Sequence, residues 1–231
     1  MKKKNIDVDD LIIQATTLLP ELFLDDNKIE ICESNLRKTC INLGAYGDNY
    51  KFTSVAKMTI NIGIYPNMSN DELFDILDAE NADMSDTILS IIDYREKTNY
   101  REERYCPKIA IVELHELYID PEYRGMGLAQ KILLRLPLII ETYFNIDCGY
   151  IGTYINPYKT QLSISEMDGE DFEYCDEDIE QDVYIKMRKT IEAAGFKAIS
   201  RKKKEKHFVT SFSSIYKQAK RNNMNYGIQF I

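Results

Sequence analysis

The stretch IAIVELHELYIDPEYRGMGLAQKILLRL, residues 109–136, decides the fold of this chain. Its first part, Ile109 to Ile119, is almost entirely apolar, which predicts a central strand covered on both faces. Asp120 and Pro121 end the strand, and a loop with glycines at 125 and 127 leads into a predicted helix. The first amides of a helix have no partners within it, so this turn predicts an anion-binding site.

The two glycines have an ordinary structural explanation as well, because any strand-to-helix turn that needs positive φ favours glycine. The loop lacks the Gly-Lys-Ser/Thr ending of a nucleotide P-loop and the GxGxxG spacing of a dinucleotide-binding loop. It resembles instead the central motif of the GNAT superfamily of acyl-CoA-dependent N-acyltransferases. The matching residues are Leu117-Tyr118-Ile119 at the strand end, Pro121-Glu122-Tyr123 in the turn, and Arg124-Gly125-Met126-Gly127-Leu128-Ala129 in the loop.

The resemblance implies an α+β (α/β/α) fold, in which helices flank a mixed β-sheet that splays open at its centre. It also implies acetyl-CoA as the acyl donor, no metal, and direct transfer of the acetyl group to a primary amine. Loop amides would hold the pyrophosphate, and the end of the strand would run beside the pantetheine arm. The expected cofactor-binding residues are Leu117, Tyr118, Ile119, Arg124, Gly125, Met126, Gly127, Leu128 and Ala129. The Arg124 side chain either contacts a phosphate or is solvated at the turn.

Glu113 is the candidate general base. A carboxylate within an apolar strand costs on the order of several kcal/mol unless it reaches water or a partner. Glu113 therefore either faces a cleft or pairs with a nearby Lys or Arg. Some GNAT histone acetyltransferases carry a catalytic glutamate on this strand six residues before its last apolar position, as Glu113 stands before Ile119. By strand parity His115 shares its face, either as a proton relay or as an ordinary core histidine, whereas Glu116 is expected on the other face.

The chain departs from the family at the general acid. Many members carry a tyrosine four residues before the Gly-Phe that ends their last helix, and here that position is Ile191. Neither Tyr158 nor Tyr184 is a convincing replacement, although a thiolate with a pKa of about 8.5 is a tolerable leaving group without an acid. Two functions therefore stay open: an acetyl-CoA-dependent N-acetyltransferase, or a non-catalytic acyl-CoA-binding regulatory or interaction protein with the same fold.

The rest of the sequence predicts a domain over residues 28–216 with an acidic insertion at 160–180, an N-terminal helical extension over 1–27 and a tail over 217–231. Apolar residues at helical spacing predict the helix within residues 8–24. Pro137 is expected to kink or break the helix that follows the glycine loop. Further expected elements are strands at 58–64 and 148–155, helices from Ser69, after Ser85 and from Asp178 to Gly195, and a hairpin of 196–200 with 207–212.

Composition narrows the class of protein and its partners. A net charge of −9 over 231 residues argues against nucleic acid and permits a cationic amine as acceptor. Ten carboxylates between residues 166 and 182 form either a solvated loop or an electrostatic funnel for such an amine. No apolar run approaches the ~20 residues of a membrane helix, so we expect a cytoplasmic protein without a membrane partner. Its expected oligomeric state is a monomer or a homodimer. The five cysteines and two histidines lack the spacing of a metal site.

Overall fold

The structure is a computed structural model that describes residues 11–18, 24–25, 28–29, 37–46, 51–63, 82–98, 109–146, 148–155, 164, 177–200 and 205–222. Its strands are β1 (Ile12–Leu18), β2 (Leu24–Asp25), β3 (Lys28–Ile29), β4 (Arg37–Tyr46), β5 (Phe52–Gly63), β6 (Ile109–Ile119), β7 (Cys148–Tyr154), β8 (Lys197–Ala198) and β9 (His207–Ser211). Its helices are α2 (Ala82–Lys97), α3 (Leu128–Phe144), α4 (Glu177–Ala193) and α5 (Phe212–Arg221), with a 3₁₀ turn, η2 (Pro121–Tyr123).

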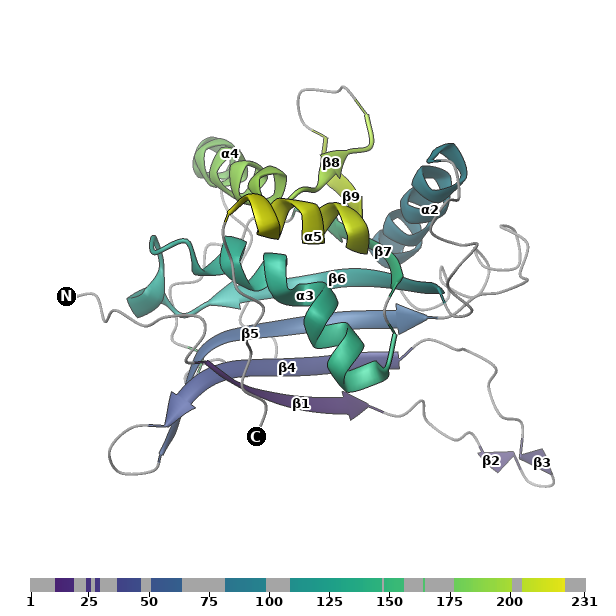
Figure 1. The fold of residues 1–231 in the computed structure, drawn as a ribbon, viewed down its shortest axis with the longest axis horizontal. Coiled ribbons are helices and arrows are strands. Elements are labelled where there is room, and N and C mark those ends of the chain that lie inside the picture. The colour runs from purple at the N-terminus through teal and green to yellow at the C-terminus, as the bar shows by residue number, and fades with distance from the viewer. Residues whose placement is uncertain are drawn as a thin grey trace.

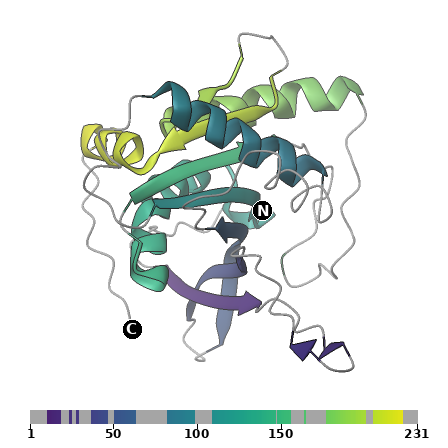
Figure 2. The same ribbon diagram turned by 90° about the vertical axis from the view of Figure 1, so that its right-hand side faces the viewer.

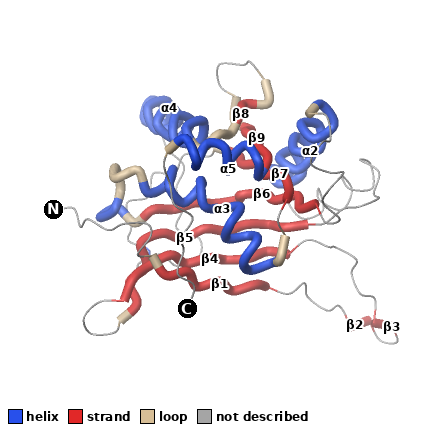
Figure 3. The backbone as a smooth tube through the Cα atoms, viewed as in Figure 1, coloured by secondary structure: helices blue, strands red, loops and turns tan. Residues whose placement is uncertain are grey.

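Seven of the described strands form one mixed sheet in the order β1-β4-β5-β6-β7-β9-β8, drawn in red in Figure 3. Every neighbouring pair is antiparallel except β6 and β7. These two strands run parallel because α3 crosses over between them. The predicted α+β fold with a parallel central pair is therefore confirmed. Strands β2 and β3 form a separate short hairpin.

Helices cover the sheet from both sides (Figures 1 and 2). Ile111 of β6 packs with Ile91 of α2, whereas the next residue, Val112, belongs to a larger core with Leu133 of α3 and residues of α5. Successive residues of a strand point to opposite faces, so α2 covers one face of β6 and α3 with α5 covers the other. Helix α2 lies close to β7 at Gly152, where a Cβ atom would come within 2.6 Å of the Cγ1 of Ile91.

Helix α3 runs unbroken through Pro137, so the break expected there does not occur. A proline inside a helix costs ~3 kcal/mol because it removes one hydrogen bond and crowds the preceding turn. Leu133, Leu136 and Ile140 of the same helix are buried in the core, and burial of each such side chain contributes ~1.5–3 kcal/mol. Packing against the sheet thus outweighs the local cost of the proline.

The helix predicted within residues 8–24 is wrong, because residues 12–18 form strand β1. This strand pairs with β4 along its whole length, from Ile12 opposite Gly44 to Leu18 opposite Lys38. Positions 12, 13, 16 and 17 are Ile, Ile, Thr and Thr, which favour a strand. β1 is therefore an outer strand of the main sheet rather than part of a helical extension over 1–27.

Several other predicted elements are present with shifted bounds. Strand β5, helix α2 and helix α4 correspond to the predicted strand at 58–64, the helix after Ser85 and the helix ending at Gly195. Strands β8 and β9 form the predicted closing hairpin, and α5 continues to Arg221, past the predicted domain end at 216. The helix predicted from Ser69 and most of the acidic insertion lie outside the described residues. None of the described helices is both long and apolar enough to cross a membrane.

Candidate functional site

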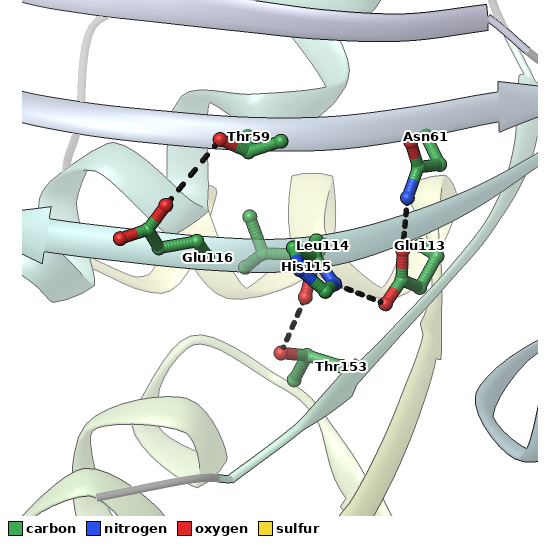
Figure 4. Close-up of polar contacts among 7 residues, drawn as sticks. All are labelled: Thr59, Asn61, Glu113, Leu114, His115, Glu116 and Thr153. Atoms are coloured by element: carbon green, nitrogen blue, oxygen red, sulfur yellow. Dashed lines mark hydrogen bonds and ion pairs between the residues drawn. The ribbon is translucent and has the colours of Figure 1, made fainter. Parts of the chain in front are cut away.

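Strands β6 and β7 separate partway along their length. Their ladder runs from Ile109 opposite Cys148 to Leu114 opposite Thr153, while β6 continues to Ile119. At the fork the hydroxyl of Thr153 donates to the carbonyl of Leu114 at 2.9 Å (Figure 4). Among the described residues, the β7-facing edge of residues 115–119 has no strand partner. The central splay that the resemblance implied is therefore present.

A cavity of about 530 Å³ opens where the two strands part, a volume in the range of sites for small molecules. Its walls are the end of β6, the glycine loop, the start of α3 and one side of α4. The predicted cofactor-binding residues that line it are Leu117, Tyr118, Ile119, Arg124, Gly125, Gly127, Leu128 and Ala129. Met126 packs instead against the hydrophobic core. The structure thus brings nearly all of these residues to one cavity.

The glycine loop, residues 124–127, ends at the N-terminus of α3, which lies at this cavity. Gly125 and Gly127 have φ values of 79° and 74°, in the left-handed region that favours glycine. Gly127 is the N-cap of α3 and supplies no side-chain hydrogen bond, and its carbonyl accepts the first helical bond from the amide of Lys131 at 3.1 Å. The amides of residues 128–130 therefore precede the helical ladder, and these residues line the cavity. Together with the helix dipole they favour an anion there.

Arg124 is ordered against the end of β6 instead of being solvated at the turn. Its Nε donates to the carbonyl of Ile119 at 2.8 Å, and its guanidinium carbon lies 4.8 Å from the ring centroid of Tyr118. The carboxylate of Asp120 accepts from the amide of Glu122 at 3.0 Å and fixes the turn before the loop. These contacts hold a positive charge on the cavity wall beside the helix N-terminus.

Glu113 lies behind the cavity wall rather than on it. Its side chain is 2% exposed and is absent from the cavity lining. Its Oε2 accepts from the Nδ2 of Asn61 on β5 at 2.5 Å, and its Oε1 lies 3.2 Å from the Nδ1 of His115 (Figure 4). This carboxylate therefore contacts an amide and an imidazole, where the pairing alternative had expected a Lys or Arg. Glu113 is thus connected to the cavity by its hydrogen bond with His115, which lines it.

His115 connects this buried carboxylate to the cavity. Its side chain is 38% exposed and lines the cavity. Because an ionised Glu113 only accepts hydrogen bonds, Nδ1 is the donor and the neutral ring keeps its lone pair on Nε2. The hydrogen bond that His115 donates to Glu113 raises the pKa of His115 above its ordinary 6.5, against an opposing effect of partial burial. This places a base with a raised pKa on the cavity wall.

A β-bulge interrupts β6 at His115. In the pairing with β5, Thr59 lies opposite Glu116 and the next residue, Ile60, lies opposite Leu114. His115 is thus the extra residue on the bulged strand, without a partner of its own in the register. A bulge of this kind redirects the side chains that follow it, so strand parity no longer holds beyond His115.

The bulge places Glu116 on the same face as Glu113, so the expectation that it faces the other side is wrong. Thr59 and Asn61 are two residues apart on β5 and therefore share a face. Asn61 bonds to Glu113, and the hydroxyl of Thr59 donates to the Oε2 of Glu116 at 3.4 Å (Figure 4). Both carboxylates consequently lie on the face of the sheet that α2 partly covers.

The second oxygen of Glu116 has no hydrogen-bond partner within the described part of the chain. Oε1 is shielded from solvent and has no hydrogen bond to any described residue, although Glu116 lines the cavity. A buried polar atom that forms no hydrogen bond costs ~1–3 kcal/mol, and a charged one costs more. Nothing in the sequence signals the bulge, which arises from the register with β5, so the position of Glu116 at the cavity could not be predicted.

Residue 191, where many GNAT proteins carry the tyrosine that serves as general acid, is an isoleucine and has no hydroxyl. Ile191 on α4 lines the cavity and is 7% exposed. The hydroxyl of Tyr184 donates to the carbonyl of Glu205 at 2.5 Å, away from the cavity lining, and Tyr158 lies outside the described residues. Tyr154 does line the cavity and was not singled out from the sequence. Its place at the carboxyl end of a parallel strand, where ligand sites gather in such sheets, is the signal that points to it.

Comparison with known proteins finds matches among solved structures only. No family model and no curated protein sequence matches the chain. One match is a mutant of the AtaT toxin bound to the C-terminus of the antitoxin AtaR and acetyl-CoA, at 12% identity over 90% of this chain and 96% of that chain, with a TM-score of 0.37. A second is the polyamine N-acetyltransferase of Drosophila melanogaster, an enzyme that forms N-acetylagmatine, at 10% identity over 74% and 73% with a TM-score of 0.35. A third is arylalkylamine N-acetyltransferase 2 from Aedes aegypti, at 11% identity over 75% and 73% with a TM-score of 0.34.

These likenesses are too distant to carry an argument about activity or substrate. The fold stands on the chain's own architecture: a mixed sheet, one parallel pair that splays, and a glycine loop that leads from that pair into a helix. This is the α+β arrangement, with helices on both sides of a mixed sheet that splays at its centre, that the resemblance of residues 117–129 implied.

Proposed function

We propose that this chain transfers an acetyl group from acetyl-CoA to a primary amine by direct attack of the amine on the thioester. One observation carries the proposal: the cavity between β6 and β7 joins an uncapped helix N-terminus to a histidine–carboxylate pair. The first feature suits the diphosphate of the donor, and the second suits deprotonation of the acceptor.

The residues present fit acetyl-CoA as the acyl donor. Amides at the start of α3 would bind the pyrophosphate, and Arg124 adds positive charge beside them. The β7-facing edge of residues 115–119, which has no strand partner among the described residues, would offer backbone groups to the amides of the pantetheine arm. Apolar side chains such as Leu117 and Leu133 exclude water from the thioester.

The acceptor must lose a proton before it can react. An alkylammonium has a pKa of about 10.4, so freeing its nitrogen at pH 7 costs ~4–5 kcal/mol. We assign the proton to the Nε2 of His115, with the charge of Glu113 stabilising the imidazolium and Asn61 holding that carboxylate in place. The nitrogen lone pair then forms the C–N bond while the C–S bond breaks and the thiolate leaves with the bonding electrons. The remaining excess proton on the nitrogen passes to that thiolate, which gives the neutral amide and the CoA thiol. Glu113 is in this scheme a positioning residue that acts through His115.

A second candidate function is a non-catalytic acyl-CoA-binding protein, which the absence of a hydroxyl at Ile191 favours. Incubation with acetyl-CoA and a panel of primary amines, while released thiol is titrated and CoA binding is followed by calorimetry, separates the two. Thiol release that depends on the amine supports the transferase. Tight CoA binding without release for any amine supports the binding protein, and no CoA binding contradicts both.

Replacing Glu113 with glutamine is expected to change the pH dependence of the reaction. The rate should rise with pH through the pKa of His115, which lies above 6.5 because of the Glu113 hydrogen bond. Without that charge the imidazolium is less stable, so the pKa falls. The acidic limb of kcat/KM should then move to lower pH, with a lower plateau. A pH–rate profile measures both effects, and an unmoved limb would contradict the assignment.

A further inference from the structure

Glu116 supplies the cavity with a carboxylate that nothing in the scheme above uses. Among the described residues that line the cavity it is the sole carboxylate. The hydroxyl of Thr59 donates to its Oε2, while no residue that the structure describes donates to its Oε1, which is shielded from solvent. An ionised carboxylate oxygen can only accept hydrogen bonds, and burying it unpaired is unfavourable. The site is therefore incomplete without a ligand that donates N–H or O–H groups to Oε1.

The charged residues that line the cavity favour different ligands, the acyl donor and the acceptor amine. Arg124 and Lys186 line it from the loop and from α4, and with the N-terminus of α3 they provide the positive potential that a diphosphate requires. A carboxylate on β6 repels such an anion and attracts a cation. Glu116 therefore contacts the acceptor rather than the acyl donor, and it selects an acceptor that is positively charged.

The reacting nitrogen is a poor partner for Glu116. A carboxylate next to an ammonium stabilises its protonated form, which would oppose the deprotonation assigned to His115. The group on Oε1 is thus better one that stays charged throughout the reaction. We propose that Glu116 binds a second cationic group of the acceptor, so that the substrates are aliphatic diamines or longer polyamines; this inference rests on the function proposed above.

A binding experiment tests this inference without requiring turnover. Cadaverine carries an ammonium at each end, and n-hexylamine has the same length with a methyl group in place of one ammonium. Each is titrated by calorimetry into the CoA-saturated protein, into Glu116→Gln and into Glu96→Gln. The control removes the same charge from an exposed position on α2, outside the cavity. Glutamine at 116 can still accept from Thr59, which keeps the fold intact, as circular dichroism verifies.

The wild-type protein and Glu96→Gln should bind cadaverine at least about tenfold more tightly than n-hexylamine, and Glu116→Gln should lose that preference. Equal affinities in the wild type, or a preference that survives in Glu116→Gln, would overturn the inference. An equal loss of affinity for both amines in Glu116→Gln would also overturn it, because Glu116 would then contact the amino group that the two share. A preference as expected, without thiol release from acetyl-CoA, would leave this inference standing and remove the proposed transferase function.

Discussion

Replacing His115 with glutamine is expected to lower kcat/KM for amine acetylation at pH 7 by about 10²–10⁴-fold, the usual contribution of a general base. The glutamine amide can still donate to the Oε1 of Glu113, so the buried carboxylate keeps a partner. It cannot take up a proton, so the acceptor must reach the cavity as the rare free amine. Steady-state kinetics with a saturating acyl donor measure the loss.

Two controls separate this loss from a structural effect. CoA affinity and the thermal midpoint should stay near wild type, because the His115 side chain is partly exposed and belongs to β6 rather than to the glycine loop. The defect should also shrink between pH 7 and pH 10, where the free amine becomes abundant without a base. A defect of equal size at every pH would show that His115 does not accept the proton.

Replacing Gly127 with valine is expected to weaken CoA binding by about tenfold to a hundredfold, since a non-glycine residue forced into the left-handed region costs ~1–3 kcal/mol. Gly127 has φ of 74°, and a Cβ atom there would meet nothing within 4 Å. The cost is therefore backbone strain rather than a clash with another part of the fold. Relief of that strain would turn the amides of residues 128–130 away from the cavity.

The matched control for this variant is Gly127→Asn. Asparagine tolerates the left-handed conformation better than β-branched residues do, so it should retain CoA affinity to within a few-fold. Calorimetric titration of CoA into the three proteins measures the order of affinities. Wild-type affinity in Gly127→Val would mean that the loop does not hold the donor.

The central part of the fold could be predicted because its signals are local. The apolar run of Ile109 to Ile119, the stop at Pro121 and the glycines before α3 each act within a few residues, and the structure contains the strand, the turn and the helix in that order. The parallel pairing of β6 with β7 follows from the helix between them. The same local stretch supplies most of the cavity lining.

Features that depend on pairing between distant segments could not be predicted. Residues 12–18 carry apolar residues at nearly helical spacing, but their backbone bonds to β4, and only that partner selects a strand. Pro137 similarly lacks a local reason to lie within a helix, because burial of its neighbours decides the outcome. In both cases tertiary contacts outweigh a propensity of a few tenths of a kcal/mol to ~3 kcal/mol.

In the candidate site, too, the features with a local signal could be predicted, and those that depend on a neighbouring strand could not. The sequence identified Glu113 as an unusual residue in an apolar strand, and His115 as a possible relay. It had no means of showing that the carboxylate lies 2% exposed behind the histidine. The bulge opposite Thr59 and Ile60 arises from the register with β5, and it alone brings Glu116 to the face of Glu113. The alternation of side chains along β6 cannot reveal the bulge, because the bulge appears only in the pairing with β5, where His115 has no partner.

The central claim is that the opening between β6 and β7 holds acetyl-CoA with its diphosphate on the glycine loop. A crystal structure of the protein with CoA tests it most directly. We expect diphosphate oxygens within hydrogen-bonding distance of amides between Gly125 and Gln130, and the pantetheine arm alongside Leu117 to Ile119. CoA bound elsewhere on the protein, or an empty cavity at saturating CoA, would contradict the claim.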